Sequence, residues 1–203
     1  IQFLCSDASK FLNGHNLMDG LNGFVSGNFL LILLSIMAII SYNELIFDIN
    51  FNKKLNILFV ICSIFFIFNF FGKCFLGDNG IYVFSIIISL LVINFVYLSN
   101  NQVSPLIAAS FLWYPAYENL FSILRRLKNR KVISKPDKLH LHVLLKNFLK
   151  IKYGERINSR YINSLSGILM NIFLLPNFIL SVYWYNSSNK ILTLIIFELI
   201  IYM

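Results

Sequence analysis

The chain has 203 residues, of which 58% are hydrophobic and only 13% are charged. Soluble domains carry roughly 25% charged residues, so the composition excludes an ordinary soluble domain and predicts a protein that crosses a membrane several times. Lysine and arginine outnumber aspartate and glutamate by 17 to 9, which gives a net charge of +8. Most of these cations fall in one segment, which indicates membrane topology and argues against nucleic-acid binding.

Four stretches without charged residues are close to the roughly 20 residues that a helix needs to cross a bilayer. They are 24–43, 55–71, 81–98 and 161–185. A fifth stretch, 103–124, contains one acid and is bent by Pro105 and Pro115, and a last one, 191–203, is expected to be an incomplete span. A bilayer admits helices because they satisfy their own backbone hydrogen bonds. The sequence therefore predicts an all-α, polytopic transmembrane helical bundle of five full spans plus a truncated sixth, as one integral membrane domain over 1–203.

Three polar segments are expected at the same end of this bundle. Two predicted spans separate the segment 16–24 from the loop 75–80, and two more separate that loop from the basic segment 125–160. The basic segment holds twelve of the seventeen lysines and arginines. Because cytoplasmic loops of membrane proteins are enriched in these residues, we expect all three segments to face the cytoplasm.

The loop 75–80 reads Phe-Leu-Gly-Asp-Asn-Gly directly before an apolar run. In one interpretation Asp78 or Asn79 caps the helix that follows, and Gly80 permits the turn. In the other, Asp78 binds Mg²⁺, a hard cation that prefers oxygen ligands and shares them with phosphates. A helix N-terminus nearby would also attract phosphate. The sequence alone leaves both interpretations open.

The segment 16–24 reads Asn-Leu-Met-Asp-Gly-Leu-Asn-Gly-Phe. Its Asp-Gly and Asn-Gly pairs are typical of a surface loop. However, Asn16, Asp19 and Asn22 recur at intervals of three residues, so on a helical or tightly turned backbone their side chains would point the same way. Amide and carboxylate oxygens arranged in this way are suited to bind a nucleotide or to share a metal ion.

In the basic segment, apolar residues at helical spacing follow Pro136 and Asp137, which suit the first turn of a helix. A cationic stripe accompanies them, with one member every four residues: Lys138, His142, Lys146 and Lys150. Such a helix could lie in the membrane interface and attract anionic lipid, or its ammonium groups and the imidazoles of His140 and His142 could converge on phosphates. A zinc site is disfavoured, because no third ligand accompanies the two histidines.

Three further polar side chains lie within predicted spans. Glu118 follows several aromatic residues near a span end, and we expect it to form a salt bridge with Arg125 or Arg126. Asn69 and Asn94 lie in otherwise apolar runs, and we expect them to form hydrogen bonds between helices.

Taken together, these segments are similar to the motifs of the polyprenyl-phosphate N-acetylhexosamine-1-phosphate transferase family (glycosyltransferase family 4). The segment 16–24 resembles the family's loop beginning Asn-Leu-x-Asp-Gly, and the loop 75–80 resembles its acidic metal loop. The stretch 115–142, from Pro-Ala-Tyr-Glu through Arg-Arg to His-Leu-His, resembles its histidine-bearing cytoplasmic loop. The His-x-His pattern is closest to the bacterial undecaprenyl-phosphate N-acetylglucosamine-1-phosphate branch.

The sequence departs from the family pattern in three ways. Asn22 stands where many relatives have aspartate, and Val143 stands where a third histidine is frequent. The family's N-terminal paired-aspartate motif is absent from these residues. We therefore expect the chain to be the C-terminal part of a larger transferase and to be inactive alone.

The resemblance implies a multi-pass enzyme of the bacterial inner membrane. Such an enzyme transfers an N-acetylhexosamine 1-phosphate from a UDP-sugar to polyprenyl (undecaprenyl) phosphate and releases UMP. The product would serve cell-envelope glycans, as in cell wall or lipopolysaccharide biosynthesis. The resemblance leaves the sugar and the oligomeric state, a homodimer included, open.

The resemblance also implies roles for individual residues. Mg²⁺, or Mn²⁺ in its place, would be bound by Asn16 and Asp78, and the catalytic residues would be Asp78 and His142. Binding of UDP-N-acetylhexosamine and its phosphates is assigned to five residues: Asp19, Asn22, Arg126, His140 and His142.

Two functions of other classes remain alternatives. A transporter or channel would place polar residues in the middle of its spans, whereas the acids here cluster at span ends. A non-catalytic membrane scaffold would use the basic segment 125–160 to bind anionic lipid. Failure of Mg²⁺ or a UDP-sugar to stabilise the protein would favour the scaffold.

Overall fold

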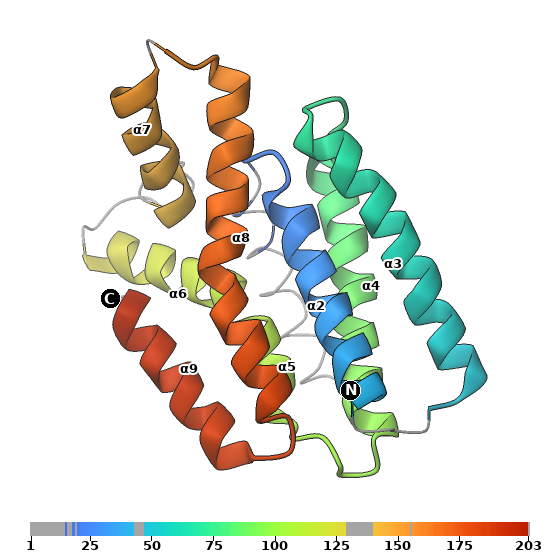
Figure 1. Cartoon of the computed structure of the whole chain (residues 1–203). Helices are drawn as coiled ribbons and strands as arrows, with labels where there is room; N and C mark the ends of the chain where they lie inside the picture. Colours follow the sequence, from blue (N-terminus) through green and yellow to red (C-terminus); the bar gives the residue numbers. More distant parts are fainter. Residues whose placement is uncertain are drawn as a thin grey trace.

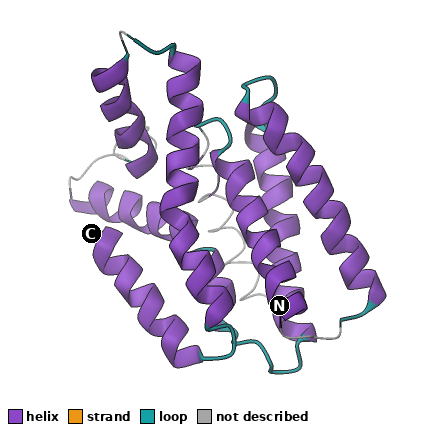
Figure 2. Ribbon diagram, in the orientation of Figure 1, coloured by secondary structure: helices purple, strands orange, loops and turns teal. Residues whose placement is uncertain are grey.

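The computed structural model describes residues 15, 18, 20–42, 47–128, 140–154 and 156–202, with the side chains of 126–128 left out. Every regular element in these ranges is a helix (Figure 2). The helices are α2 (Phe24–Tyr42), α3 (Ile49–Phe70), α4 (Gly77–Leu98), α5 (Leu106–Phe111), α6 (Trp113–Lys128), α7 (Leu141–Tyr153), α8 (Ser159–Tyr183) and α9 (Ser188–Tyr202). The predicted all-α fold is confirmed.

Four of these helices, α2, α3, α4 and α8, are long and apolar enough to cross a membrane. They correspond to the four charge-free stretches of the sequence. α3 begins earlier than its stretch and includes Lys53 and Lys54 in its first turns, and α8 continues through Pro176. The prediction of a multi-pass membrane protein is therefore confirmed.

The predicted fifth span, 103–124, is instead broken into two helices. α5 has six residues and ends at Phe111, because the next residue, Leu112, has a φ of −107° and a ψ of 14°, which are not helical. α6 then crosses the bundle at a steep angle to α8 (Figure 1). Pro115 suits the first turn of α6, because its missing N–H would be unpaired there anyway. The count of full spans thus falls from five to four, and α9, with 15 residues, is also shorter than those four.

The helices bring the polar segments to one end of the bundle. α2, α3 and α4 run in alternating directions, and α5, α6 and α7 together return the chain to the end where α3 stops and α8 begins (Figure 1). The Asn22 side chain there contacts Ser164 near the start of α8. The expected shared face is confirmed for the described residues, while its cytoplasmic orientation stays a prediction.

The core forms around α2, which packs mainly against α8 and α3. Its apolar side chains, such as Phe29, Ile32 and Ile36, are almost fully buried. Small residues allow the close approach of α8 that membrane helices require. Gly167 is one of these, because a Cβ at this position would overlap the Asn22 carbonyl oxygen and crowd the Phe24 nitrogen at 3.3 Å.

Substitution of Gly167 by alanine should force α2 and α8 apart. We expect Gly167→Ala to lower the free energy of unfolding by about 1–3 kcal/mol, as overpacking does elsewhere, measured by thermal unfolding in detergent. Gly80→Ala is the matched control, because its Cβ would meet only the flexible Leu76 side chain at 3.3 Å. Equal stability of the two variants would contradict this account of the α2–α8 contact.

Candidate functional site

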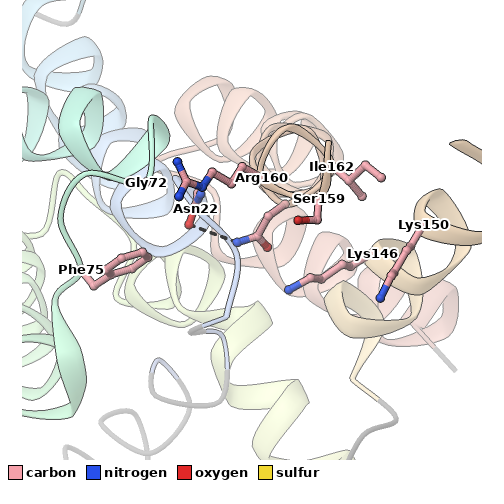
Figure 3. Close-up of a pocket in the computed structure, with 9 residues that line it drawn as sticks. Asn22, Gly72, Phe75, Lys146, Lys150, Ser159, Arg160 and Ile162 are labelled. Carbon is pink, nitrogen blue, oxygen red and sulfur yellow. Dashed lines mark hydrogen bonds between the residues drawn. The ribbon is translucent and has the colours of Figure 1, made fainter. Parts of the chain in front are cut away.

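A cavity of about 530 Å³ lies at the end of the bundle where the polar segments meet (Figure 3). Its walls come from the loop before α2, the α3–α4 loop, α7 and the start of α8. The residues that line it are Asn22, Gly72, Phe75, Lys146, Lys150, Ser159, Arg160, Ile162 and Asn163. All three polar segments of the sequence therefore contribute to one site.

The lining residues make the cavity cationic. Lys146 and Lys150 lie one turn apart on α7, and Arg160 lies in the first turn of α8 on another side of the cavity (Figure 3). The nine lining residues include no carboxylate to neutralise these charges. Phe75 contributes an aromatic ring that is 68% exposed. Such a cavity is suited to an anion that also carries a planar ring.

Asn22, one of the predicted substrate-binding residues, lies in this cavity with its amide held in a fixed orientation. Its Oδ1 accepts a hydrogen bond from Asn163 Nδ2 at 3.1 Å, and its Nδ2 donates to Ser164 Oγ at 3.3 Å. Gly72, at a φ of +65°, lies so close that a Cβ would be 3.0 Å from Asn22 Nδ2. Glycine fits here because it adopts positive φ freely and leaves room for the amide.

Asn69 ties the two loop motifs together. Its Oδ1 accepts hydrogen bonds from the Gly23 backbone N–H at 2.8 Å and from Ser26 Oγ at 3.1 Å. Its Nδ2 donates to the Cys74 carbonyl oxygen at 2.9 Å, beside Phe75 of the acidic loop. The expectation that Asn69 bonds between helices is confirmed, and the bond network extends into both loops.

Asp78 is exposed and lies inside the first turn of α4. The residue at the N-cap position is Leu76, so the interpretation of Asp78 or Asn79 as the helix cap was wrong. A carboxylate in the first turn is nevertheless favoured by the helix dipole. No group of three or more acids, histidines or cysteines is gathered for a metal within the described residues. Asn16 and Asp19 lie outside the described residues, so the metal site stays a prediction.

His140 and His142 do not line the cavity but are buried against Glu118. His140 Nδ1 is 2.6 Å from Glu118 Oε2, and His142 Nδ1 is 3.7 Å from Oε1. The predicted cationic stripe therefore splits, with His142 facing inward while Lys146 and Lys150 face the cavity. Residues four apart drift around a helix of 3.6 residues per turn. Lys138 lies outside the described residues.

The expected salt bridge of Glu118 with Arg125 or Arg126 stays a prediction, and the contacts of Glu118 that the structure describes are with other groups. Glu118 is fully buried, and its Oε1 accepts from Tyr114 Oη at 2.6 Å and from the Leu141 backbone N–H at 3.1 Å. Burial alone would raise the pKa of this carboxyl, but hydrogen bonds from His140 and Tyr114, with the His142 ring close by, outweigh it and hold the pKa well below its usual range. The prediction favoured arginines nearby on the same helix, whereas the described contacts come from Tyr114 on α6 and from His140 and Leu141 at the start of α7. The Arg126 side chain lies outside the described residues.

Several cavity residues carried no functional prediction. Arg160 was counted only toward membrane topology, and Asn163 lies in a run that reads as an apolar span. Phe75 belongs to the loop 75–80, in which the functional prediction concerned Asp78 alone. Arg160 ends the basic segment, Asn163 follows it, and Phe75 precedes an acid. None of these positions shows in the sequence that α8 extends beyond α2 to meet the two loops.

Over 141 residues the chain is 34% identical to a probable undecaprenyl-phosphate N-acetylglucosaminyl 1-phosphate transferase from Bacillus subtilis (strain 168). The match covers 67% of this chain and 37% of the relative, so the chain spans little more than a third of that protein's length. No family model matches the chain, and no solved structure matches it.

Removal of the Asn69 amide should loosen both loops. We expect Asn69→Ala to lower the free energy of unfolding by about 1–3 kcal/mol, because buried partners such as the Gly23 N–H lose their bond. Hydrogen exchange should also rise in residues 20–26 and 71–77. Asn94→Ala, at an exposed position of α4, is the matched control. Unchanged exchange in both loops would show that Asn69 does not hold them.

Proposed function

Because the chain belongs to the polyprenyl-phosphate N-acetylhexosamine-1-phosphate transferase family, we propose that it takes part in transfer of a sugar 1-phosphate from a UDP-sugar to a polyprenyl phosphate. The observation that carries this proposal is the cationic cavity to which all three polar segments contribute at one end of a membrane bundle. In the proposed orientation this end faces the cytoplasm of a bacterium, and the product enters envelope glycan synthesis.

The cavity supports a nucleotide-sugar donor. Lys146, Lys150 and Arg160 would attract its diphosphate, and a guanidinium can bind phosphate through two parallel hydrogen bonds. The exposed ring of Phe75 offers a face on which a planar base stacks. The oriented amide of Asn22 offers a donor and an acceptor to the edge of such a base.

A divalent cation fits the oxygen donors of the two loop motifs. Asp78, exposed in the first turn of α4, and Asn16 would hold Mg²⁺, with Mn²⁺ as the alternative. Bound there, the ion would neutralise charge on the reacting phosphates. Asp19 would help to position the sugar nucleotide, and His140, His142 and Arg126 would act on phosphates from the side of α6 and α7.

The reaction itself depends more on neutralising the negative charge of the phosphates than on acid–base chemistry. An oxygen of the lipid phosphate attacks the β-phosphorus of the UDP-sugar, the bond to the α-phosphate oxygen breaks, and UMP leaves with that oxygen. The product is a polyprenyl diphosphate sugar. Because three phosphates repel each other as they approach, cations fixed around them lower the barrier. The apolar spans accommodate the polyprenyl tail.

Asp78→Ala in the full-length protein should abolish Mg²⁺-dependent transfer, because the main metal ligand is lost. The measurement follows radiolabel from UDP-N-acetylhexosamine into polyprenyl phosphate in membranes. Lys53→Ala, in the first turns of α3 at the opposite end of that helix, should leave transfer near wild type. Normal turnover of the Asp78 variant would refute this assignment of the metal site.

The double variant Lys146→Ala, Lys150→Ala should raise KM for the UDP-sugar at least tenfold, because two charge-assisted contacts with the diphosphate disappear. The effect should shrink as salt rises, since screening weakens these contacts in the wild type too. Lys152→Ala is the control on the same helix, because its ammonium lies over the Phe148 and Tyr153 rings and does not line the cavity. An equal KM for the double variant and the control would contradict a role for the α7 lysines.

A further inference from the structure

Glu118 lies on α6 and bonds the residues that begin α7, although it does not line the cavity. We propose that Glu118 is a positioning residue that fixes both histidines and the start of α7, and through α7 the two cavity lysines. This inference rests on the proposed function only for its effect on the reaction. The contacts themselves concern this chain alone.

No side chain of α7 or its N-cap residue caps this helix. His140 occupies the N-cap position, and its side chain accepts no hydrogen bond from the helix. The Leu141 backbone N–H instead donates to Glu118 Oε1 at 3.1 Å. The open N–H groups of a helix start attract an anion. Glu118 therefore acts as a cap supplied by a different helix.

The Glu118 carboxylate also orients the imidazoles of His140 and His142. At 2.6 Å from Glu118 Oε2, His140 Nδ1 must carry the hydrogen, because an ionised carboxylate only accepts. In its neutral form His140 then has Nε2 free as an acceptor. His142 stacks on His140 with ring centroids 5.5 Å apart and an angle of 13° between the planes. The orientation of the pair thus depends on Glu118.

Burial of the Glu118 carboxylate destabilises the fold unless hydrogen-bond partners compensate the loss of water. Taking a charge out of water is strongly unfavourable, and an apolar residue would serve packing alone equally well. Glu198 offers the contrast within this chain. It is also a buried glutamate, but its Oε2 has no hydrogen-bond partner among the described residues. The dense set of donors around Glu118 indicates that its function is to hold the groups that donate.

The first test measures positioning without measuring activity. Glu118→Gln and Glu118→Ala, made in the full-length protein in detergent, should raise hydrogen exchange in the first turn of α7, residues 141–144, at least tenfold. The matched variant Glu198→Gln should leave exchange there unchanged. If Glu118→Ala fails to fold, Glu118→Gln decides, because it keeps the side-chain shape and removes the charge. Unchanged exchange in Glu118→Gln would overturn the proposal.

The second test concerns the reaction. Glu118→Gln should lower kcat for sugar-phosphate transfer at least tenfold. In a His140→Ala, His142→Ala background the same change should lower kcat less than twofold further, because the groups through which it mainly acts are gone. Fully additive losses, or a wild-type kcat in Glu118→Gln, would overturn the role in the reaction. A wild-type protein without transferase activity would refute the proposed function and leave the exchange result to decide the positioning role.

Discussion

Both backbone polar groups of Gly23 are bound by side-chain amides from other helices. Its N–H donates to Asn69 Oδ1 of α3 at 2.8 Å, and its carbonyl oxygen accepts from Asn171 Nδ2 of α8, also at 2.8 Å. At a φ of +76° this residue must be glycine, and its Cβ would lie 3.3 Å from the Phe66 ring. Irregular backbone survives near a bilayer only where protein groups satisfy it. The two amides therefore permit a loop at the place where three helices converge.

The bonds of the two amides to Gly23 fix the position of the cavity and also determine which side chains line it. The loop fixed at Gly23 carries Asn22, and Asn69 extends the same bonds to Cys74 in the α3–α4 loop. With both loops anchored, α7 and the start of α8 close the remaining sides, and the charged side chains that they bring to the lining are all cations. The cavity lining therefore combines neutral amides, an aromatic ring and positive charge. This combination favours a phosphorylated ligand over a cationic or purely apolar one.

The sequence predicts most of the architecture because long apolar runs between charged loops leave few alternatives. Counting spans even placed the three polar segments at one end, although 103–124 is not a straight span. The reason is that α5, α6 and α7 together advance the chain as a single helix would. The partner of Glu118 was harder to predict. Two of its contacts, with His140 Nδ1 and the Leu141 N–H, lie 22 and 23 residues along the chain at the start of α7, whereas helical spacing favoured Arg125 and Arg126.

Buried polar side chains join α5 to the last turns of α8. Ser110 of α5 donates to Asn177 Oδ1 at 2.8 Å and pairs with Ser181 Oγ at 2.6 Å, while Asn177 Nδ2 donates to the Ser110 carbonyl oxygen at 2.9 Å. All three side chains are buried and satisfy one another. A conduction path needs polar groups that exchange partners with a passing solute or ion. Here such groups join α5 to α8, and the open, charged cavity lies at the end of the bundle where α8 begins, which supports the proposed transfer reaction over conduction.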